Sequence, residues 1–157
     1  MLEAYTASTR ARTLKSLLPR SIQTDPYDSV KDVQAKGISQ IDVVIFCAVI
    51  VKLITIEDMP LEEYEEVLMV NAISVMLLYK ATLALLRKAS HPAKFVFIGG
   101  AGDSLNDMQN NPVPDASHAS SKALASCLVV KMGMENDWLI TLCINPGRVC
   151  SISNRAL

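Results

Sequence analysis

The segment 117–122 carries residue types that transfer protons, because it contains His118 and Lys122 four positions apart. It opens an apolar stretch that predicts a helix over 116–134. At 3.6 residues per turn, the two side chains lie on one helix face, one above the other. A lysine cation near an imidazole disfavours the imidazolium, so we expect His118 to act as a neutral proton acceptor near pH 7.

A second interpretation treats His118 as a packed or solvated residue without a chemical role. The presence of an acid/base residue above a lysine favours the catalytic interpretation. Three aspartates precede the helix in a polar loop, Asp103, Asp107 and Asp115. Loop aspartates are usually solvated, but one that folds back onto His118 would orient the imidazole, as the carboxylate of a hydrolase triad does.

Three apolar runs alternate with three helical patterns along the chain. The runs 41–50, 94–98 and 138–144 predict strands, and the helical patterns cover 25–36, 61–87 and 116–134. This alternation predicts an α/β fold with a parallel sheet and right-handed crossovers. The run 41–50 is continuous and β-branched, which is typical of a parallel strand buried on both faces.

The carboxyl ends of these strands form the expected ligand-binding edge, because parallel sheets bind ligands there. The edge carries Cys47 after the first strand, Gly99 and Gly100 after the second, and the Asn-Pro-Gly sequence 145–147 after the third. We interpret Cys47 as a packing residue rather than a nucleophile, since nothing near it in sequence would activate the thiol.

Length, charge and cysteine spacing exclude several classes of protein. A chain of 157 residues suits one domain with a real core, and a net charge of −1 gives no field that attracts nucleic acid or an anionic membrane. No apolar run reaches the roughly 18 residues of a transmembrane helix, and no Cys-x-x-Cys pair indicates a metal site. We therefore expect a cytoplasmic protein with an N-terminal segment, 1–24, and one domain, 25–157.

Five segments in order resemble the short-chain dehydrogenase/reductase family, and fungal polyketide ketoreductases in particular. They are IDVVIFCAVI, Val70-Asn71-Ala72, FVFIGGAG, HASSK and INPGRV. In the family these correspond to the strand ending in Asn-Ala-Gly, the helix with the catalytic Asn, the strand ending in Ser-Ser, the Tyr-x-x-Ser-Lys motif and the Pro-Gly segment around the nicotinamide. The resemblance spans 25–149 and implies a truncated Rossmann-like three-layer fold with a reduced parallel sheet.

The resemblance also implies roles for individual residues. In the family, Tyr protonates the carbonyl, Lys tunes that Tyr and binds the nicotinamide ribose, Ser polarises the substrate oxygen, and Asn positions a relay water. This chain retains Asn71 and Lys122, whereas His118 stands in place of Tyr and Gly100 in place of Ser. Ser104 is near enough in sequence to replace that Ser. The candidate catalytic residues are therefore His118, Lys122, Asn71 and Ser104, although a structural role that bridges backbone groups is favoured for Asn71.

The cofactor half of the family pattern is not found in this sequence. No glycine precedes Gly37, so the glycine-rich turn whose amides bind the cofactor pyrophosphate has no counterpart. Cys47 and Val49 replace the Asn and Gly that shape the cofactor pocket, and Val49 would crowd backbone that Gly leaves open. We therefore expect no bound cofactor, and NADPH only if the chain is a reductase.

Three functions are compatible with these features. The preferred prediction is a non-redox acid/base catalyst, of the isomerase, cyclase or dehydratase type, that acts on a small polyketide-like molecule. His118 would move the proton, Lys122 would tune it, and backbone amides of 99–102 would bind an oxyanion. The alternatives are a catalytically inactive scaffold or partner protein and an NADPH-dependent ketoreductase, because fold alone does not determine function.

The predicted sheet also has an open edge, because the family's first strand has no counterpart here. An unpaired apolar edge promotes association, so either segment 1–24 or another subunit must cover it. The family dimerises through the helices that correspond here to 61–88 and 116–134, and the second of these is rich in small residues. We therefore predict a homo-oligomer that binds a small molecule and neither nucleic acid nor membrane.

Overall fold

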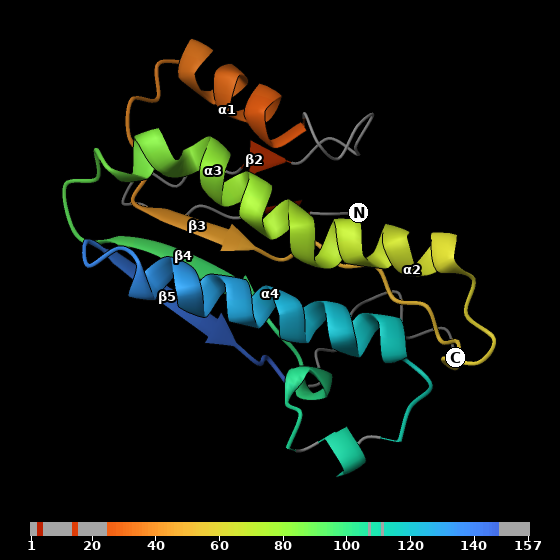
Figure 1. The fold of residues 1–157 in the computed structure, drawn as a ribbon. Coiled ribbons are helices and arrows are strands. Elements are labelled where there is room, and N and C mark those ends of the chain that lie inside the picture. The colour runs from red at the N-terminus through yellow and green to blue at the C-terminus, as the bar shows by residue number, and fades with distance from the viewer. Residues whose placement is uncertain (1–2, 5–13, 16–24, 107, 111, 148–157) are drawn as a thin grey trace.

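Three parallel strands form the centre of the computed structural model, which describes residues 3–4, 14–15, 25–106, 108–110 and 112–147. The strands are β3 (Val43–Phe46), β4 (Ala93–Ile98) and β5 (Leu139–Ile144), and they lie side by side in that order (Figure 1). Val43 pairs with Lys94, and Ala93 pairs with Leu139, so the strands begin at the same end of the sheet. The predicted α/β fold with a reduced parallel sheet is confirmed.

Helices connect the strands as crossovers. α1 (Asp25–Ala35) precedes β3 and lies against α3, and α4 (Ala116–Met134) joins β4 to β5. Beyond α1, Gly37 takes a φ of +80°, a left-handed conformation that ends a helix and favours glycine. Two short 3₁₀ turns, η2 (Ala101–Asp103) and η3 (Met108–Asn110), lie in the connection before α4.

The connection between β3 and β4 is one continuous helix with a π-helical turn inside it. α2 (Leu61–Leu68) passes into the π turn η1 (Met69–Ile73) and then into α3 (Ser74–Leu86). The sequence pattern predicts an uninterrupted α-helix, because a single wider turn barely disturbs the apolar spacing. Among the described residues this helix alone is long and apolar enough to cross a membrane. Part of this helix packs against α4 and the sheet, and Val75, Leu85 and Leu86 belong to the buried core.

Two phenylalanines of β4 lie at the centre of the core. Phe95 and Phe97 are fully buried, and the ring of Tyr79 on α3 meets Phe95 edge-on with 5.8 Å between centroids. Leu85 on α3 and Val129 on α4 are buried in the same cluster. The core therefore lies between the sheet and the layer of α3 and α4, which cover one face of the sheet (Figure 1).

The other face of the sheet is more exposed than the sequence predicts. Thr141 and Cys143 of β5 contact α4. The alternate residues point away from α4 and are each 42 % exposed: Ile140, Leu142 and Ile144. The prediction of a strand buried on both faces over 41–50 is therefore wrong. β3 is shorter, and Val43 and Ile45 are only half-buried, because α3 and α4 lie on the opposite face and α1 contacts α3 rather than the sheet.

The two edges of this sheet are β3 and β5, and within the described ranges neither has a hydrogen-bonded strand on its outer side. β1 (Glu3–Ala4) and β2 (Leu14–Lys15) form a separate antiparallel pair. The rest of 1–24 lies outside the described residues, and so does the prediction that this segment covers the open edge.

Candidate functional site

α4 presents three polar residues in one row. His118, Lys122 and Ser126 follow one another at intervals of four, which places them on one helix face. The first turn is closed by the amide of Ala119, which donates to the carbonyl of Asp115 at 2.9 Å. The row reaches the carboxyl end of β4, the edge at which parallel sheets bind ligands.

Lys122 is the buried cation of this row. The residue is 4 % exposed. Its Nζ donates a hydrogen bond to the carbonyl of Ile98 at 2.6 Å and lies 4.6 Å from the centroid of the Phe97 ring. Burial lowers the pKa of the Lys122 ammonium, and the acidic groups of Asp103 and Cys47 oppose that shift. An ammonium has three donors, so two remain beyond the bond to Ile98, the hydrogen bond that Nζ makes within the described part of the chain.

Asp103 is fixed near Lys122 by the turn that follows β4. Its Oδ2 accepts hydrogen bonds from the Gly100 amide and the Ser126 hydroxyl, each at 3.2 Å. Gly99 lets the carboxylate approach, because a Cβ at this position would lie 2.5 Å from Oδ2. The carboxylate thus serves as a fixed counter-charge to the ammonium.

His118 pairs with the carboxylate of Asp115, the residue before the helix. His118 Nδ1 and Asp115 Oδ2 are 3.3 Å apart, and the two side chains are 18 % and 14 % exposed. The amide of Asp115 donates to the carbonyl of Val113 at 2.8 Å, and Asp115 forms a parallel bridge with Ile54. Of the loop aspartates considered from the sequence, Asp115 is the one beside the imidazole, and Asp107 lies outside the described residues.

Asn71 clamps the chain that follows β3. Its side chain is fully buried in the π turn. Its Oδ1 accepts a hydrogen bond from the Ile50 amide at 2.9 Å. Its Nδ2 donates to the Ile50 carbonyl at 2.9 Å and to Ser121 Oγ at 3.0 Å. Ser121 Oγ in turn donates to the carbonyl of His118 at 2.7 Å. Both N–H groups of Asn71 are engaged, so this geometry joins the loop after β3 to α4.

The turn after β4 contains the remaining candidates. Ser104 follows η2 as an exposed residue, and no hydrogen bond within the described residues joins it to α4. The amide of Gly99 donates to the carbonyl of Ile144 at 2.8 Å, and the amide of Gly100 donates to Asp103. Both glycine amides are therefore engaged inside the protein, so neither of these two is left for the oxyanion site predicted over 99–102.

Two residues that the sequence does not single out for chemistry complete the surroundings of Lys122. Ser126 is four positions further along α4, and this helical spacing is the signal that identifies it. Cys47 follows β3, and the negative charge that its thiol can carry opposes the lowering of the pKa of Lys122. The site thus combines a buried amine with an imidazole–carboxylate pair on one helix, a set that can bind a hydroxyl oxygen and transfer a proton.

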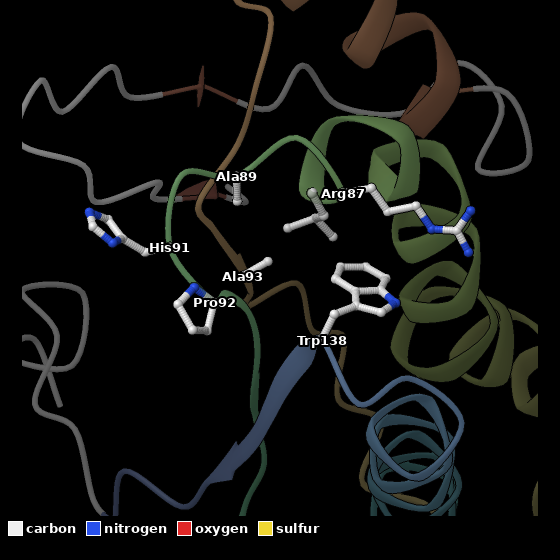
Figure 2. Close-up of a pocket in the computed structure, with 7 residues that line it drawn as sticks. Arg87, Ala89, His91, Pro92, Ala93 and Trp138 are labelled. Carbon is white, nitrogen blue, oxygen red and sulfur yellow. The ribbon is translucent and has the colours of Figure 1, made fainter.

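A pocket of about 610 Å³ opens at the opposite end of the sheet (Figure 2). It lies at the amino ends of β4 and β5, and Arg87, Pro92 and Trp138 are among the residues that line it. The guanidinium carbon of Arg87 lies 5.7 Å from the centroid of the Trp138 ring, so the cation stacks on the pocket wall. We place the candidate site at the carboxyl edge instead, because the acid/base groups gather there and parallel sheets bind ligands there.

Comparison with known sequences identifies fungal relatives, although no protein-family model matches the chain. Norsolorinic acid ketoreductase nor1 of Dothistroma septosporum is 36 % identical over 133 residues, which cover 82 % of this chain and 50 % of that protein. Norsolorinic acid ketoreductase stcE of Emericella nidulans is 31 % identical over 153 residues, which cover 96 % of this chain and 58 % of the relative. The chain spans about half the length of the curated relatives it matches.

Solved structures share the fold. The NADPH-bound carbonyl reductase from chicken fatty liver matches with a TM-score of 0.73 at 23 % identity, covering 82 % of this chain and 56 % of that one. An alcohol dehydrogenase from Thermococcus sibiricus, complexed with 5-hydroxy-NADP, gives a TM-score of 0.72 at 21 % identity over 82 % of this chain and 52 % of that one. The Rossmann-like fold prediction is therefore confirmed.

The relatives contradict the preferred functional prediction. They are named ketoreductases, so the predictions of a cofactor-independent isomerase, cyclase or dehydratase and of no cofactor are wrong. By sequence the chain is similar to fungal ketoreductases and short-chain dehydrogenases, and by fold it is similar to solved reductases and dehydrogenases.

Proposed function

We propose that the chain reduces the carbonyl group of an apolar, polyketide-like ketone, with NADPH as the hydride donor. The observation that carries this proposal is the buried ammonium of Lys122 at the carboxyl end of β4, one helical turn from His118. In this family a cation binds the cofactor ribose and an acid protonates the substrate oxygen, and these two residues suit both tasks. The relatedness to ketoreductases supports the reaction type.

The residues around Lys122 fit the nicotinamide end of NADPH. Its two ammonium protons beyond the bond to Ile98 suit the hydroxyls of a ribose. Gly100, in the turn after β4, leaves open space, since a Cβ there would meet no atom within 4 Å. When bound, NADPH supplies the hydride that attacks the carbonyl carbon. Lys122 would bind the ribose, and Asp103 would balance the charge of the ammonium.

His118 is the proton donor in this proposal. Because its Nδ1 lies beside Asp115, Nε2 is the nitrogen left to donate. In this step His118 starts as the imidazolium and is a proton donor, not the neutral acceptor expected from the sequence. As the carbonyl carbon gains a hydride, its oxygen gains negative charge and takes the Nε2 proton of the imidazolium, which leaves an alcohol and a neutral imidazole. The cation of Lys122 stabilises the developing charge in a site shielded from water.

The segment after β3 favours an apolar substrate. It exposes alternate apolar side chains, Val49, Val51 and Leu53. Asn71 anchors the segment at Ile50, and the bridge between Ile54 and Asp115 brings its far end to the start of α4. A ketone that covers these side chains gains about 25 cal/mol for each Å² of apolar surface removed from water. The matched relatives are named for a substrate of this reaction type, norsolorinic acid.

The proposal includes a homo-oligomer in the cytoplasm, where NADPH is supplied. Exposed apolar residues mark the outer side of α4: Leu124, Val130 and Met134. Contact with a second copy would remove this surface from water and satisfy the two-fold symmetry that most soluble oligomers adopt. Light scattering measures the mass of the full chain, and a monomer at every protein concentration would contradict the oligomer.

Ketone-dependent NADPH oxidation tests the proposed reaction. The full chain is incubated with NADPH and an apolar aryl ketone, and the loss of NADPH absorbance is followed. We expect turnover that falls about 100-fold or more in His118→Ala, and a raised KM for NADPH in Lys122→Met. The control is His91→Ala, since His91 lies in the pocket at the opposite end of the sheet. Equal rates in wild type and His118→Ala would contradict the proposal.

A further inference from the structure

Asp115 makes an unusual contact for a residue at a helix N-cap. Aspartate at this position normally accepts a hydrogen bond from an amide of the first turn. The side chain of Asp115 makes no such bond, and its carboxylate lies 3.3 Å from Nδ1 of His118 instead. The helix start thus forgoes a stabilising cap and forms an imidazole–carboxylate pair.

The pair is shielded from water and its backbone is fixed. Both side chains are largely buried, so water competes little for the ring nitrogen. Asp115 is tied to Ile54 by the parallel bridge, its amide donates to Val113, and its carbonyl accepts from Ala119. A carboxylate whose backbone is fixed on both sides can fix the ring that it contacts.

We infer that Asp115 is a positioning residue for proton transfer, which binds Nδ1–H of His118 and leaves Nε2 to serve the reacting oxygen. The inference rests on the proposed reduction. A carboxylate at Nδ1 selects one imidazole tautomer and stabilises the imidazolium before the proton leaves. During the reduction the Nε2 proton goes to the substrate oxygen, Nδ1 keeps its proton, and Asp115 stays ionised. Without the carboxylate, the ring is free to rotate and to adopt the other tautomer.

The tautomer of His118 can be measured directly, because the chain has two histidines. Nitrogen-15 NMR, with His91→Gln for assignment, separates protonated from unprotonated ring nitrogens at the alkaline end of the titration, where the ring is neutral. We expect Nδ1–H to dominate in the wild type and to decline in Asp115→Ala and Asp115→Asn. Asp137→Asn, an exposed aspartate at the other end of α4, should leave the tautomer unchanged. Both Asp115 variants should fold, because this side chain does not cap the helix, and Asp115→Asn also preserves its size.

Kinetics of the same variants test the role in the reaction. With NADPH and an apolar ketone, we expect kcat to fall roughly 10- to 100-fold in both Asp115 variants, with little change in KM. An unchanged tautomer, or a loss confined to KM, would overturn the inference. If the wild-type chain reduces no ketone, the proposed function fails, and the tautomer comparison alone then decides whether Asp115 fixes the ring.

Discussion

Replacing Asn71 with alanine removes the link between the loop after β3 and α4. The buried amide shares three hydrogen bonds with Ile50 and Ser121. Each is a neutral hydrogen bond with a net contribution of about 1 kcal/mol, so their loss sums to about 3 kcal/mol. Ile50 is half-buried, so water can replace part of the hydrogen bonding that its backbone amide and carbonyl lose. This replacement limits any further loss of stability. We therefore expect Asn71→Ala to lower the free energy of unfolding by about 3 kcal/mol.

Urea unfolding followed by circular dichroism measures this change. Asn71→Asp is the sharper variant, because it keeps the size and the acceptor for the Ile50 amide but cannot donate to the Ile50 carbonyl or to Ser121. We expect it to lose at least about 2 kcal/mol, one for each donor bond removed, since burying the new carboxyl at this fully buried position adds a further cost. The matched control is Asn106→Ala in an exposed turn, which should stay within about 0.5 kcal/mol of wild type. If both Asn71 variants lost as little unfolding free energy as Asn106→Ala, the claim that Asn71 joins the loop after β3 to α4 would be refuted.

Three further predictions concern Lys122, Gly99 and Gly37. Burial lowers the pKa of Lys122 below its ordinary value of 10.5, so the unfolded chain binds more protons between the folded-state value and 10.5. The free energy of unfolding therefore rises with pH across that window. Urea titrations at stepped pH should show this rise in wild type but not in Lys122→Met. The same dependence of unfolding free energy on pH in both proteins would contradict the prediction. Gly99→Ala places a Cβ 2.5 Å from the Asp103 carboxylate and should cost about 1–3 kcal/mol, a loss that adding Asp103→Ala should reduce. Gly37→Ala forces alanine to a φ of +80° and should lower the free energy of unfolding by about 1–2 kcal/mol; an unchanged urea midpoint would show that this turn relaxes.

The strands and helices could largely be predicted from the sequence, because capping and apolar periodicity are local. α4 spans the predicted 116–134, and β5 differs from its predicted run by one residue. The π turn could not be predicted, since it accompanies the contact of Asn71 with Ile50, 21 residues away in sequence. The exposure of the sheet face opposite α3 and α4 could not be predicted from the sequence either. It depends on which helices cover the sheet rather than on the composition of the strands.

Only part of the candidate site is encoded locally. The shared face of His118 and Lys122 follows from helical spacing. The choice of Asp115 among the loop aspartates needs the path of the loop, which the bridge to Ile54 fixes. The pairing of Asp103 with Ser126 needs the turn after β4. The reaction type does not follow from the sequence, because the glycine-rich turn has no counterpart whereas Asn71 and Lys122 are retained. The ketoreductase relatives are what favours a reduction.

The most direct test of carbonyl reduction follows one hydrogen atom from the cofactor to the product. The full chain is incubated with an apolar ketone and NADPH that carries deuterium at the transferred position, and the product is analysed by mass spectrometry. We predict an alcohol with one deuterium on its carbinol carbon, in an amount that falls in His118→Ala. Recovery of unchanged ketone, or a product that forms equally well without NADPH, would contradict the assignment as a reductase.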